Sequence, residues 1–461
     1  MLDELSVYIP EDRRQAMARG ETLPERTQGA ALFADISGFT PLTEALVHHY
    51  GPQRGAEELI SHLDRVYNTL IEQLHRYSGS IIGYSGDAIT CWLDRDDGSR
   101  AIAAALGMQA AMKQLLSISL PTGQTISLAV KVVIVVGDGR RLLVGDPAIQ
   151  LIDVLGGSIA EQLAVAAQVV HSGEVLVDAK TAQQLSGILI AGEQRESLDG
   201  SQSFTVVTNL RVSVEPMPWP EIPPEALTEE ALRPWVLPAL YERMRQGHGQ
   251  FLTELRPTVA LFLRFGGIDY EHNPEAGKQL DAYIRWVQAV LARYEGVLLQ
   301  VTLGEKGSYL YGTFGAPVVH EDDARRSVAA AMELHSPPES LSFVHPVPIG
   351  LSRGTMRTGP TGSTLRRTYG VLGDEVNVAA RLMEAAAPGE IIASERVAKR
   401  VIGLFESVPL PPLKVKGKSE PLPVYRITNA VRLSNRVAST HGGRLVGRTS
   451  QRSQMDIPFP P

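Results

Sequence analysis

The sequence predicts an α+β protein made of two copies of one domain. The same order of elements, with a strand, a helix, a hairpin, a helix, two strands, a helix and a strand, occurs twice along the 461 residues. Matching segments lie roughly 216 to 229 residues apart, far beyond solenoid periods, which implies duplication of a whole domain. With 44% apolar and 21% charged residues, the chain has the composition of a globular protein with two or three cores.

Charge and cysteine content exclude several classes of protein. A formal net charge of -7 argues against general affinity for nucleic acid or anionic membranes. The single cysteine, Cys91, allows neither an intramolecular disulfide nor a Cys-rich metal site and fits a reducing compartment. Residues 1–19 do not resemble a signal peptide, and no stretch reaches the roughly 20 apolar residues that span a bilayer. We therefore expect a cytoplasmic protein, monomeric with its two domains paired within the chain.

The first repeat begins with an apolar run that predicts a strand over 30–36. Thr40 and Pro41 fit the N-cap and first position of a helix that reaches about Tyr77, with a break near Gly51-Pro52. A hairpin follows, with Ser85-Gly86-Asp87 at its turn. The remaining predicted elements are a helix over 99–116, strands over 126–136 and 140–144, a helix over 159–170 and a strand over 174–177.

The second repeat follows the same order. Its predicted elements are a strand over 258–265, a helix over 275–294, a hairpin over 297–314, a helix over 322–334, strands over 348–354 and 368–372, a helix over 375–387 and a strand over 390–393. Between the repeats, residues 215–238 contain seven prolines and cannot continue a helix or central strand. Trp219 and Trp235 in this segment favour a packed arm over free disorder. The expected division is an N-terminal extension (1–27), a first domain (28–210), a linker or arm (211–254), a second domain (255–428) and a C-terminal tail (429–461).

Each repeat carries a different pair of special residues. Asp35 lies in the segment ADISGFT and Asp87 in YSGDAI, whereas Asn377 and Arg381 lie in GVLGDEVNVAARLMEAAAPGEI. Asn377 and Arg381 are four residues apart on a predicted helix and share a face. Taken singly, an aspartate at a turn is more often a cap, and a helical Asn or Arg is usually solvated. The complementary set instead favours one composite site at the interface between the repeats.

These motifs resemble the catalytic domains of class III adenylyl and guanylyl cyclases, in the tandem arrangement of bicarbonate-responsive soluble adenylyl cyclases and their bacterial relatives. The resemblance implies two ferredoxin-like domains that form an intramolecular pseudo-heterodimer. It also implies conversion of ATP to 3′,5′-cyclic AMP and pyrophosphate with two divalent metal ions, Mg²⁺ or Mn²⁺. Hard ions of this kind prefer carboxylate and phosphate oxygens.

The resemblance assigns a role to each candidate site residue. Asn377 would orient the ribose and Arg381 would stabilise the charged phosphorus. The implied metal ligands are Asp35, Ile36 and Asp87. The implied phosphate-binding residues are Ser37, Gly38, Phe39, Thr40, Lys416 and Lys418, the first four as backbone N–H groups that run into a helix. Lys306 would contact the base and favours ATP over GTP, whereas Gly370, at the second base-selecting position, offers no side chain.

Alignment of the two repeats with each other predicts that the pseudo-symmetric second site has lost its function. Arg264 stands where the first repeat has Asp35, and the Lys306-Gly307 region stands where it has Asp87. Glu161 and Val165 stand opposite Asn377 and Arg381. The lysine and arginine of bicarbonate-responsive relatives are replaced by Gly83 and by a residue near Val165, so we expect no activation by bicarbonate.

Two other functions stay open. The tandem domains could form an inactive nucleotide-binding pseudo-cyclase that serves as a signalling module. The sequence favours a phosphodiesterase or polymerase-like enzyme less strongly, because YSGDAI lacks the second acid of a diguanylate cyclase hairpin. Near the end, GGRLVGRTS resembles the opening of an ATPase module that follows such tandems in many relatives, and the sequence stops before any GxxxxGK[ST] phosphate loop.

Overall fold

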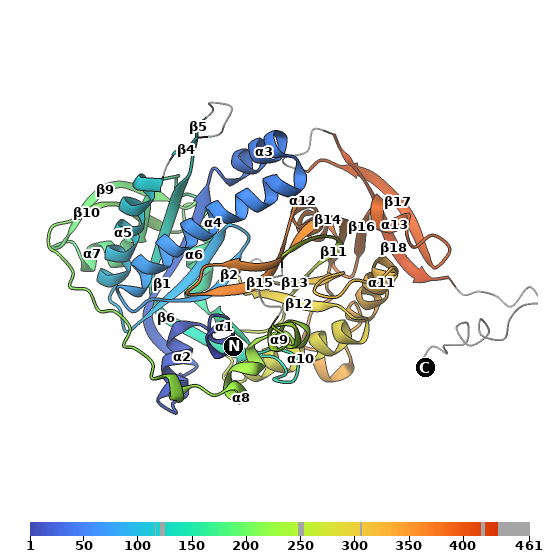
Figure 1. The fold of residues 1–461 in the computed structure, drawn as a ribbon, viewed down its shortest axis with the longest axis horizontal. Coiled ribbons are helices and arrows are strands. Elements are labelled where there is room, and N and C mark those ends of the chain that lie inside the picture. The colour runs from blue at the N-terminus through green and yellow to red at the C-terminus, as the bar shows by residue number, and fades with distance from the viewer. Residues whose placement is uncertain (116, 120–124, 248–252, 305–306, 416–419, 432–461) are drawn as a thin grey trace, which may run out of the picture.

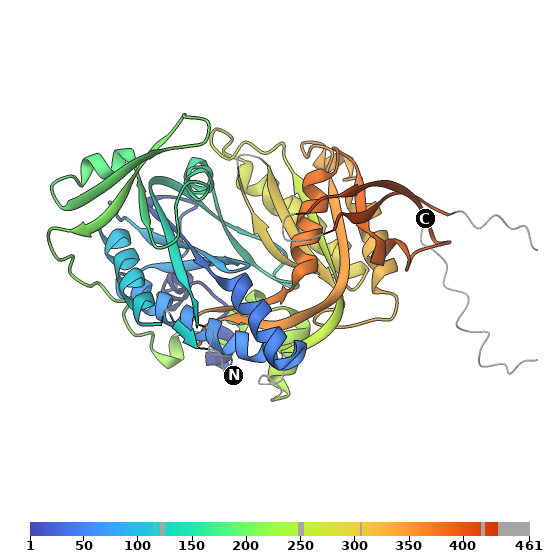
Figure 2. The ribbon, with the colours of Figure 1, turned by 90° about the horizontal axis from the view of Figure 1, so that it is seen from above.

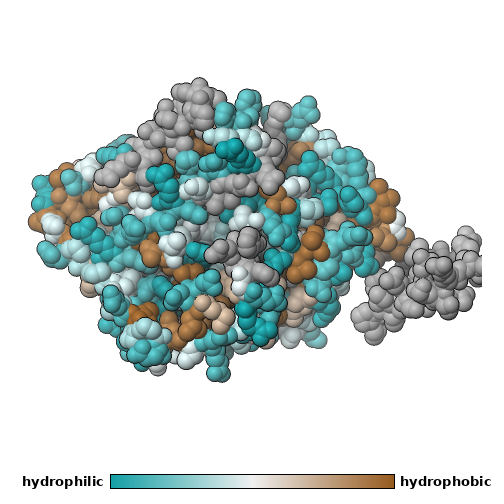
Figure 3. All heavy atoms as spheres, viewed as in Figure 1, coloured by the Kyte–Doolittle hydropathy of each residue, from teal (hydrophilic) through white to brown (hydrophobic). Residues whose placement is uncertain are grey.

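The computed structural model describes the whole chain except residues 116, 120–124, 248–252, 305–306, 416–419 and 432–461. Two mixed sheets, each with helices, lie side by side and account for most of the described chain (Figure 1, Figure 2). This confirms the prediction of an α+β protein with two similar domains. The face of the molecule in Figure 3 is mainly hydrophilic, with small apolar groups scattered over it.

The first sheet has the strand order β2-β3-β1-β6-β8-β10-β9, with β7 paired to β6. Its strands are β1 (Arg26–Ser37), β2 (Ser80–Ser85), β3 (Ala88–Asp94), β6 (Ala129–Val144), β7 (Ile152–Gly156), β8 (Val175–Asp178), β9 (Leu189–Glu196) and β10 (Ser203–Leu210). A separate ribbon consists of β4 (Ser117–Ser119) and β5 (Thr125–Ser127). The helices of this half are α3 (Phe39–Tyr50), α4 (Pro52–His75), α5 (Ser99–Leu115), α6 (Ser158–Ala166) and α7 (Ala179–Gln184).

The second sheet repeats that order as β12-β13-β11-β14-β16-β18-β17, with β15 paired to β14. Its strands are β11 (Glu254–Phe265), β12 (Val297–Thr302), β13 (Ser308–Phe314), β14 (Ile349–Gly362), β15 (Arg367–Leu372), β16 (Ile391–Ser394), β17 (Phe405–Leu413) and β18 (Leu422–Ala430). Its helices are α10 (Ala276–Arg293), α11 (Asp323–Leu334), α12 (Asp374–Ala385) and α13 (Glu395–Ala398). The equal strand order fits duplication of one domain.

Each domain extends a two-stranded arm onto the other. The β6–β7 arm packs on α10, and Leu142, Val144 and Val154 from this arm are buried in the core of the second domain. The β14–β15 arm correspondingly packs on α4 of the first domain. Reciprocal arms of this kind bury apolar surface from both domains together, so they fix the relative position of the two sheets.

The N-terminal and linker segments also pack on the domains. The N-terminal helices are α1 (Leu2–Ser6) and α2 (Glu11–Ala18), and the linker forms α8 (Glu229–Leu232) and α9 (Pro238–Arg245) with the short 3₁₀ turns η1 (Pro224–Ala226) and η2 (Arg233–Trp235). Trp235 is only 6% exposed and lies in a core cluster with Leu5, Ile9 and Phe262. The Trp219 indole N–H donates to the Gly79 carbonyl at 2.9 Å. The prediction of a packed arm is therefore confirmed.

Three predicted boundaries are wrong. The helix predicted from Thr40 begins earlier, at Phe39, so Thr40 is not its N-cap. The helix predicted over 159–170 ends at Ala166. The two strands predicted on either side of Gly137–Gly139 are one strand, β6, which pairs with β1 without a break. Gly139 is needed for packing, because a Cβ at this position would lie 2.9 Å from the Trp92 indole.

No helix within the described part of the chain is long and apolar enough to cross a membrane. Strands β4, β7, β9, β10, β17 and β18 lie outside the segments predicted from the sequence.

Candidate active site at the domain interface

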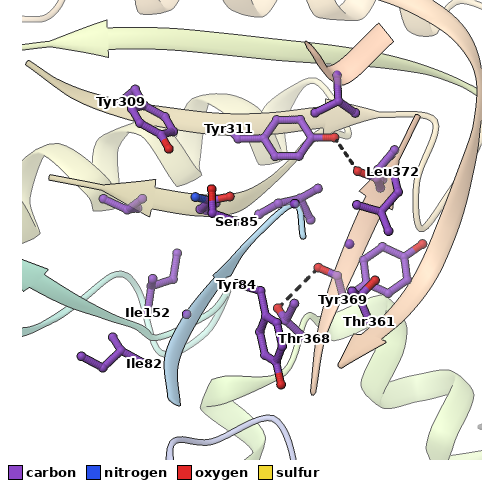
Figure 4. A pocket seen from close by; sticks show the side chains of 18 of the residues that line it. Ile82, Tyr84, Ser85, Ile152, Tyr309, Tyr311, Thr361, Thr368, Tyr369 and Leu372 are labelled. Carbon is purple, nitrogen blue, oxygen red and sulfur yellow. Dashed lines mark hydrogen bonds between the residues drawn. The ribbon is translucent and has the colours of Figure 1, made fainter. Parts of the chain in front are cut away.

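Two cavities lie between the domains, and residues of both domains line each one. The first, of about 390 Å³, extends from the β2–β3 turn to the β14–β15 arm (Figure 4). Of the candidate site residues, Asp87 comes from the first domain, and Gly370 and Asn377 come from the second. One candidate residue of the first domain and two of the second therefore line the same cavity.

Two carboxylates lie together beside this cavity. Asp35 lies near the end of β1, opposite Ala88, and the Ile36 N–H donates to the Asp87 carbonyl at 3.2 Å, which brings both aspartates to the same sheet end. Lys131 on the neighbouring strand β6 forms an ion pair with Asp35 at 2.8 Å. Burial and the nearby Asp35 carboxylate raise the pKa of Asp87 to about 6, and Lys131 partly opposes this increase. The carboxylates of Asp35 and Asp87 therefore repel each other when both are ionised, and a bound cation would relieve this repulsion.

A buried tyrosine supports the turn that carries Asp87. Tyr67 on α4 donates its hydroxyl hydrogen to the Gly86 carbonyl at 3.2 Å. Its ring meets Tyr84 edge to face, with ring centroids 5.5 Å apart. Burial raises the pKa of Tyr67 well above its usual value, so this phenol remains a donor at neutral pH. Helix α4 thus sets the position of the turn.

The segment between β1 and α3 turns sharply at Gly38. Gly38 has a φ of 91°, and a Cβ on it would lie 2.5 Å from the Ser127 carbonyl oxygen, so only glycine fits. Ser37 ends β1, and Phe39 and Thr40 open the 12-residue helix α3. The backbone of Ser37–Thr40 therefore leads directly into a helix N-terminus.

Asn377 and Arg381 both lie on the exposed face of α12, as predicted, but only Asn377 lines the cavity. Arg381 forms an ion pair with Glu384 at 2.6 Å, and both side chains are 50% exposed. An exposed pair of this kind contributes at most about 1 kcal/mol. Glu384 itself lines the cavity, so the arginine is paired at its edge, and little free energy holds it there.

The base-selecting residues are only partly described. Gly370 lies on β15 in the wall of the cavity. Lys306, Lys416 and Lys418 lie outside the described residues.

The donor set suits a hard divalent ion, although no group of three or more His, Cys, Asp or Glu side chains that could hold a metal occurs in the described ranges. The Ile36 side chain is 2% exposed and buried in the core, so only its carbonyl could serve as a ligand. Two carboxylates and a carbonyl are oxygen donors of the type that Mg²⁺ and Mn²⁺ accept, with the remaining ligands supplied by phosphate and water. The residues present fit the predicted metal.

The second cavity, of about 600 Å³, collects the residues predicted to form the degenerate site. Glu161, Val165, Arg264 and Gly307 all line it. Ser308 pairs with Phe265 at the position that corresponds to Asp87, so the second domain has no carboxylate there. Gly83 also lines this cavity, whereas Arg264 places one cation in it from the second domain.

Sequence reasoning misses two charged residues near the site, Lys131 and Glu384. Lys131 alternates with apolar residues in a strand, and nothing in the pattern shows that its partner strand carries Asp35. Glu384 is three residues after Arg381, a spacing at which helical ion pairs form, so this contact could have been predicted.

Comparison with known proteins shows that this chain is similar to adenylate and guanylate cyclases. Residues 302–429 match the adenylate and guanylate cyclase catalytic domain, a stretch that contains Asn377 and Arg381. Human adenylate cyclase type 10 is 24% identical over 401 residues, which is 79% of this chain and 24% of the human protein. The mouse enzyme of the same name is 24% identical over 462 residues, 92% of this chain and 28% of the relative. The chain thus spans about a quarter of the length of these curated relatives.

One solved structure shares the two-domain fold. A class III adenylyl cyclase-like ATP-binding protein from Pseudomonas aeruginosa has a TM-score of 0.55 over 85% of this chain and 93% of its own, at 12% identity. Both halves of the present chain therefore have the cyclase fold.

Proposed function

We propose that this chain is an adenylyl cyclase that converts ATP to 3′,5′-cyclic AMP and pyrophosphate at one composite site. The observation that carries the proposal is the cavity shared by Asp87 of the first domain with Asn377 and Gly370 of the second. The homology to adenylate cyclase type 10 over most of the chain supports it.

The reaction sets clear demands on the site. The ribose 3′-oxygen forms a bond to the α-phosphorus, the bond from that phosphorus to the bridging oxygen breaks, and the 3′-hydroxyl proton leaves to solvent as pyrophosphate departs. Negative charge therefore has to be held at both ends of an in-line displacement. Divalent ions, when bound, would polarise the attacking oxygen and neutralise the triphosphate.

The chain's own residues meet these demands from both domains. Asp35 and Asp87 would hold the metal ions, together with the Ile36 carbonyl. The backbone N–H groups of Ser37–Thr40, at the N-terminus of α3, would bind phosphate oxygens. Asn377 would orient the ribose within the cavity.

Arg381 has to leave Glu384 and turn toward the α-phosphate. Because the present ion pair is exposed, this reorientation costs little, and a triphosphate offers a stronger partner than one carboxylate. A charge-assisted contact made only as the phosphorus becomes five-coordinate would raise kcat more than it changes KM.

A second candidate function is a nucleotide-binding pseudo-cyclase. The ion pair that holds Arg381 on Glu384 favours it, as does the fold shared with a protein described as an adenylyl cyclase-like ATP-binding protein. The complete set of Asp35, Asp87, Asn377 and Arg381 favours the active enzyme.

The test is to incubate the chain with ATP and either Mg²⁺ or Mn²⁺ and to quantify cyclic AMP by chromatography. Asp87→Asn and Arg381→Ala are assayed beside the wild type, with Asp138→Asn, an exposed aspartate on β6, as the matched control. We expect metal-dependent product that both site variants lose by at least about 100-fold, a loss of about 2.7 kcal/mol of transition-state stabilisation. Folded wild-type protein that forms no cyclic nucleotide from ATP or GTP with either metal would support the pseudo-cyclase instead.

A further inference from the structure

An arginine of the second domain holds the strand that leads to the Asp87 turn of the first. Arg366 lies between β14 and β15 and is only 6% exposed. Its Nε donates to the Ile81 carbonyl at 3.3 Å and its Nη2 to the Ile82 carbonyl at 3.5 Å, both on β2. The β2–β3 ladder has a register shift between Ile81 and Gly83, so these contacts lie where strand pairing is interrupted.

Arg366 is also a buried cation that gives its hydrogen bonds to the backbone alone. Its Nη1 donates to the Val7 carbonyl at 3.4 Å and to the Arg367 carbonyl. In the part of the chain that the structure describes, Arg366 forms no ion pair, and Asp153 and Asp12 act on it only from a longer distance. A buried charge without a paired carboxylate is costly, whereas a guanidinium with several N–H donors can join several backbone segments. The contacts of Arg366 therefore connect segments of the chain and do not neutralise a neighbouring acid.

Tyr84, on β2, makes the reverse contact with the arm. Its hydroxyl donates to the Arg366 carbonyl at 2.5 Å, and the Arg366 Cζ lies 5.8 Å from the centroid of its ring. Gly362, at the end of β14, has a φ of 124°, and a Cβ on it would lie 2.7 Å from the Tyr84 hydroxyl oxygen. Glycine at this position leaves the space that the hydroxyl occupies. The arm thus forms a socket for Tyr84, which lines the first cavity (Figure 4).

The contacts continue from Tyr84 to the turn. Tyr84 is three residues before Asp87, and its ring meets Tyr67 edge to face with ring centroids 5.5 Å apart. The Tyr67 hydroxyl donates to the Gly86 carbonyl at 3.2 Å. Packed side chains and hydrogen bonds therefore run without a gap from Arg366 of the second domain to the residue before Asp87.

We propose that Arg366 and Tyr84 are positioning residues through which the second domain orients the metal-binding turn of the first. The inference rests on the proposed function, because it takes Asp87 as a metal ligand. Contacts behind a ligand fix its direction, and their loss lowers metal affinity although they never touch the ion. The metal site would thus be complete only when the β14–β15 arm is seated on β2.

The experiment measures the Kd of the full chain for Mn²⁺ without nucleotide, from the electron paramagnetic resonance signal of free Mn²⁺. Tyr84→Phe removes the hydroxyl and retains the ring. Tyr294→Phe is its matched control, because the Tyr294 hydroxyl donates to Glu333 at 3.0 Å within the second domain. Asp87→Asn shows the size of the effect when a ligand itself is lost.

The second variant, Arg366→Lys, retains the charge but cannot donate to both β2 carbonyls in the same way. Arg140→Lys is its matched control. Arg140 is 4% exposed and donates to the Tyr270 and Asn273 carbonyls of the opposite domain at 2.9 and 3.0 Å. This control removes a buried contact between the domains that does not involve β2, so it separates positioning of the turn from general loosening of the interface.

We expect Tyr84→Phe and Arg366→Lys to raise the Kd for Mn²⁺ by about 5- to 10-fold, and the two controls to change it by less than about twofold. The Tm in EDTA should be the same for Tyr84→Phe and Tyr294→Phe, so that a loss of stability does not explain the weaker binding. An unchanged Kd in Tyr84→Phe and Arg366→Lys, or an equal increase in their controls, overturns the proposal.

Failure of the cyclase assignment is distinguishable from failure of this inference. If the wild type forms cyclic AMP, both variants should raise the Mn²⁺ concentration for half-maximal rate by the same factor as the Kd, with KM for ATP at saturating Mn²⁺ unchanged within about twofold. The expected order of Mn²⁺ affinities without any cyclic product supports the inference and contradicts the cyclase assignment. A wild type that binds Mn²⁺ no more tightly than Asp87→Asn overturns the inference, because Asp87 is then not a ligand.

Discussion

At the scale of single residues, the candidate metal site is held in an electrostatically unfavourable state. Asp87 has a pKa of about 6 because it is largely removed from water and faces Asp35. Its protonated form is favoured in the folded protein, so its stabilising contribution is complete below the usual carboxyl pKa near 4 and is lost as the pH rises through 6. Above pH 6 the metal-free protein carries the cost of two neighbouring carboxylates.

Replacing Asp87 should therefore stabilise the metal-free protein. We expect Asp87→Asn to raise the free energy of unfolding in EDTA at pH 7.5 by about 1–2 kcal/mol, with a smaller gain at pH 5, because solvent partly screens the site. Mn²⁺ should raise the Tm of the wild type more than that of the variant. Thermal unfolding at both pH values checks this, with Asp138→Asn as control. A variant that is less stable than the wild type at pH 7.5 would show that the pair is not strained.

Glu384 restrains Arg381 in the present arrangement. Glu384→Gln removes the exposed ion pair, so we expect kcat to rise by no more than about fivefold, because such pairs contribute less than about 1 kcal/mol. Glu395→Gln, which breaks the exposed pair with Lys399 at 3.0 Å, is the control. Steady-state kinetics give the result. A fall in kcat as large as that of Arg381→Ala would give Glu384 a direct role in the reaction.

At the scale of elements, a buried ionic cluster joins α2 to the β6–β7 arm. Asp153 on β7 accepts from Arg13 Nε at 3.0 Å and pairs with Arg141 on β6, which also contacts Asp12 at 2.7 Å. Burial alone would raise the pKa of Asp153, but Arg141 and Arg13 lower it to about 2. Its stabilising contribution is thus present above the usual carboxyl pKa and is lost only as the pH falls toward 2.

Breaking this cluster should be far more damaging than removing a surface charge. Asp153→Ala leaves two buried arginines without their shared carboxylate and is expected to cost about 3–5 kcal/mol of unfolding free energy. Asp138→Ala on the neighbouring exposed position of β6 should change it by less than about 0.5 kcal/mol. Urea denaturation measures both. Equal free energies of unfolding for Asp153→Ala and Asp138→Ala would mean that solvent or Asp12 balances the charge of the two arginines.

The elements that could be predicted are those with strong local signals. Helices α4, α5 and α10 follow from their apolar periodicity, and the β2–β3 turn follows from Ser85-Gly86-Asp87. Strand β6 is predicted as two strands because Gly139 is interpreted as part of a turn. The glycine is instead needed because the Trp92 ring lies against it on the same sheet. Strands β9 and β17 are largely exposed edge strands, which lack the alternating apolar pattern that makes a strand visible.

At the scale of the whole molecule, the two pseudo-symmetric surfaces produce two cavities with different chemistry. The first contains Asp87 and Asn377, whereas the second has Arg264, Val165 and Glu161 in the corresponding places. That the special residues converge could be predicted from complementary motifs. The Lys131–Asp35 ion pair depends on strand register, which no single segment of sequence contains, whereas the Arg381–Glu384 pair follows from helical spacing.

This asymmetry predicts one nucleotide per chain. Titration calorimetry with a non-cyclisable ATP analogue and Mn²⁺ should give a stoichiometry of one. Two equal sites would mean that the second cavity also accepts triphosphate, although Arg264 and Ser308 replace the two metal-binding aspartates there.

The second cavity should also be unresponsive to bicarbonate. It has Gly83 and the helix near Val165 where cations are expected, and among the described residues that line it the one cation, Arg264, comes from the opposite domain. We expect the rate of cyclic AMP formation at constant pH and ionic strength to be unchanged by bicarbonate relative to chloride. A several-fold increase would contradict this and would direct attention to Arg264.

A crystal structure of the chain with Mn²⁺ and a non-cyclisable ATP analogue, with the metal located by anomalous scattering, would show whether both domains build one site. Manganese is expected at Asp35 and Asp87, the ribose at Asn377 and the base at the β14–β15 arm, with the second cavity free of nucleotide. A nucleotide held by one domain alone, or manganese away from both aspartates, would contradict a site built by both domains.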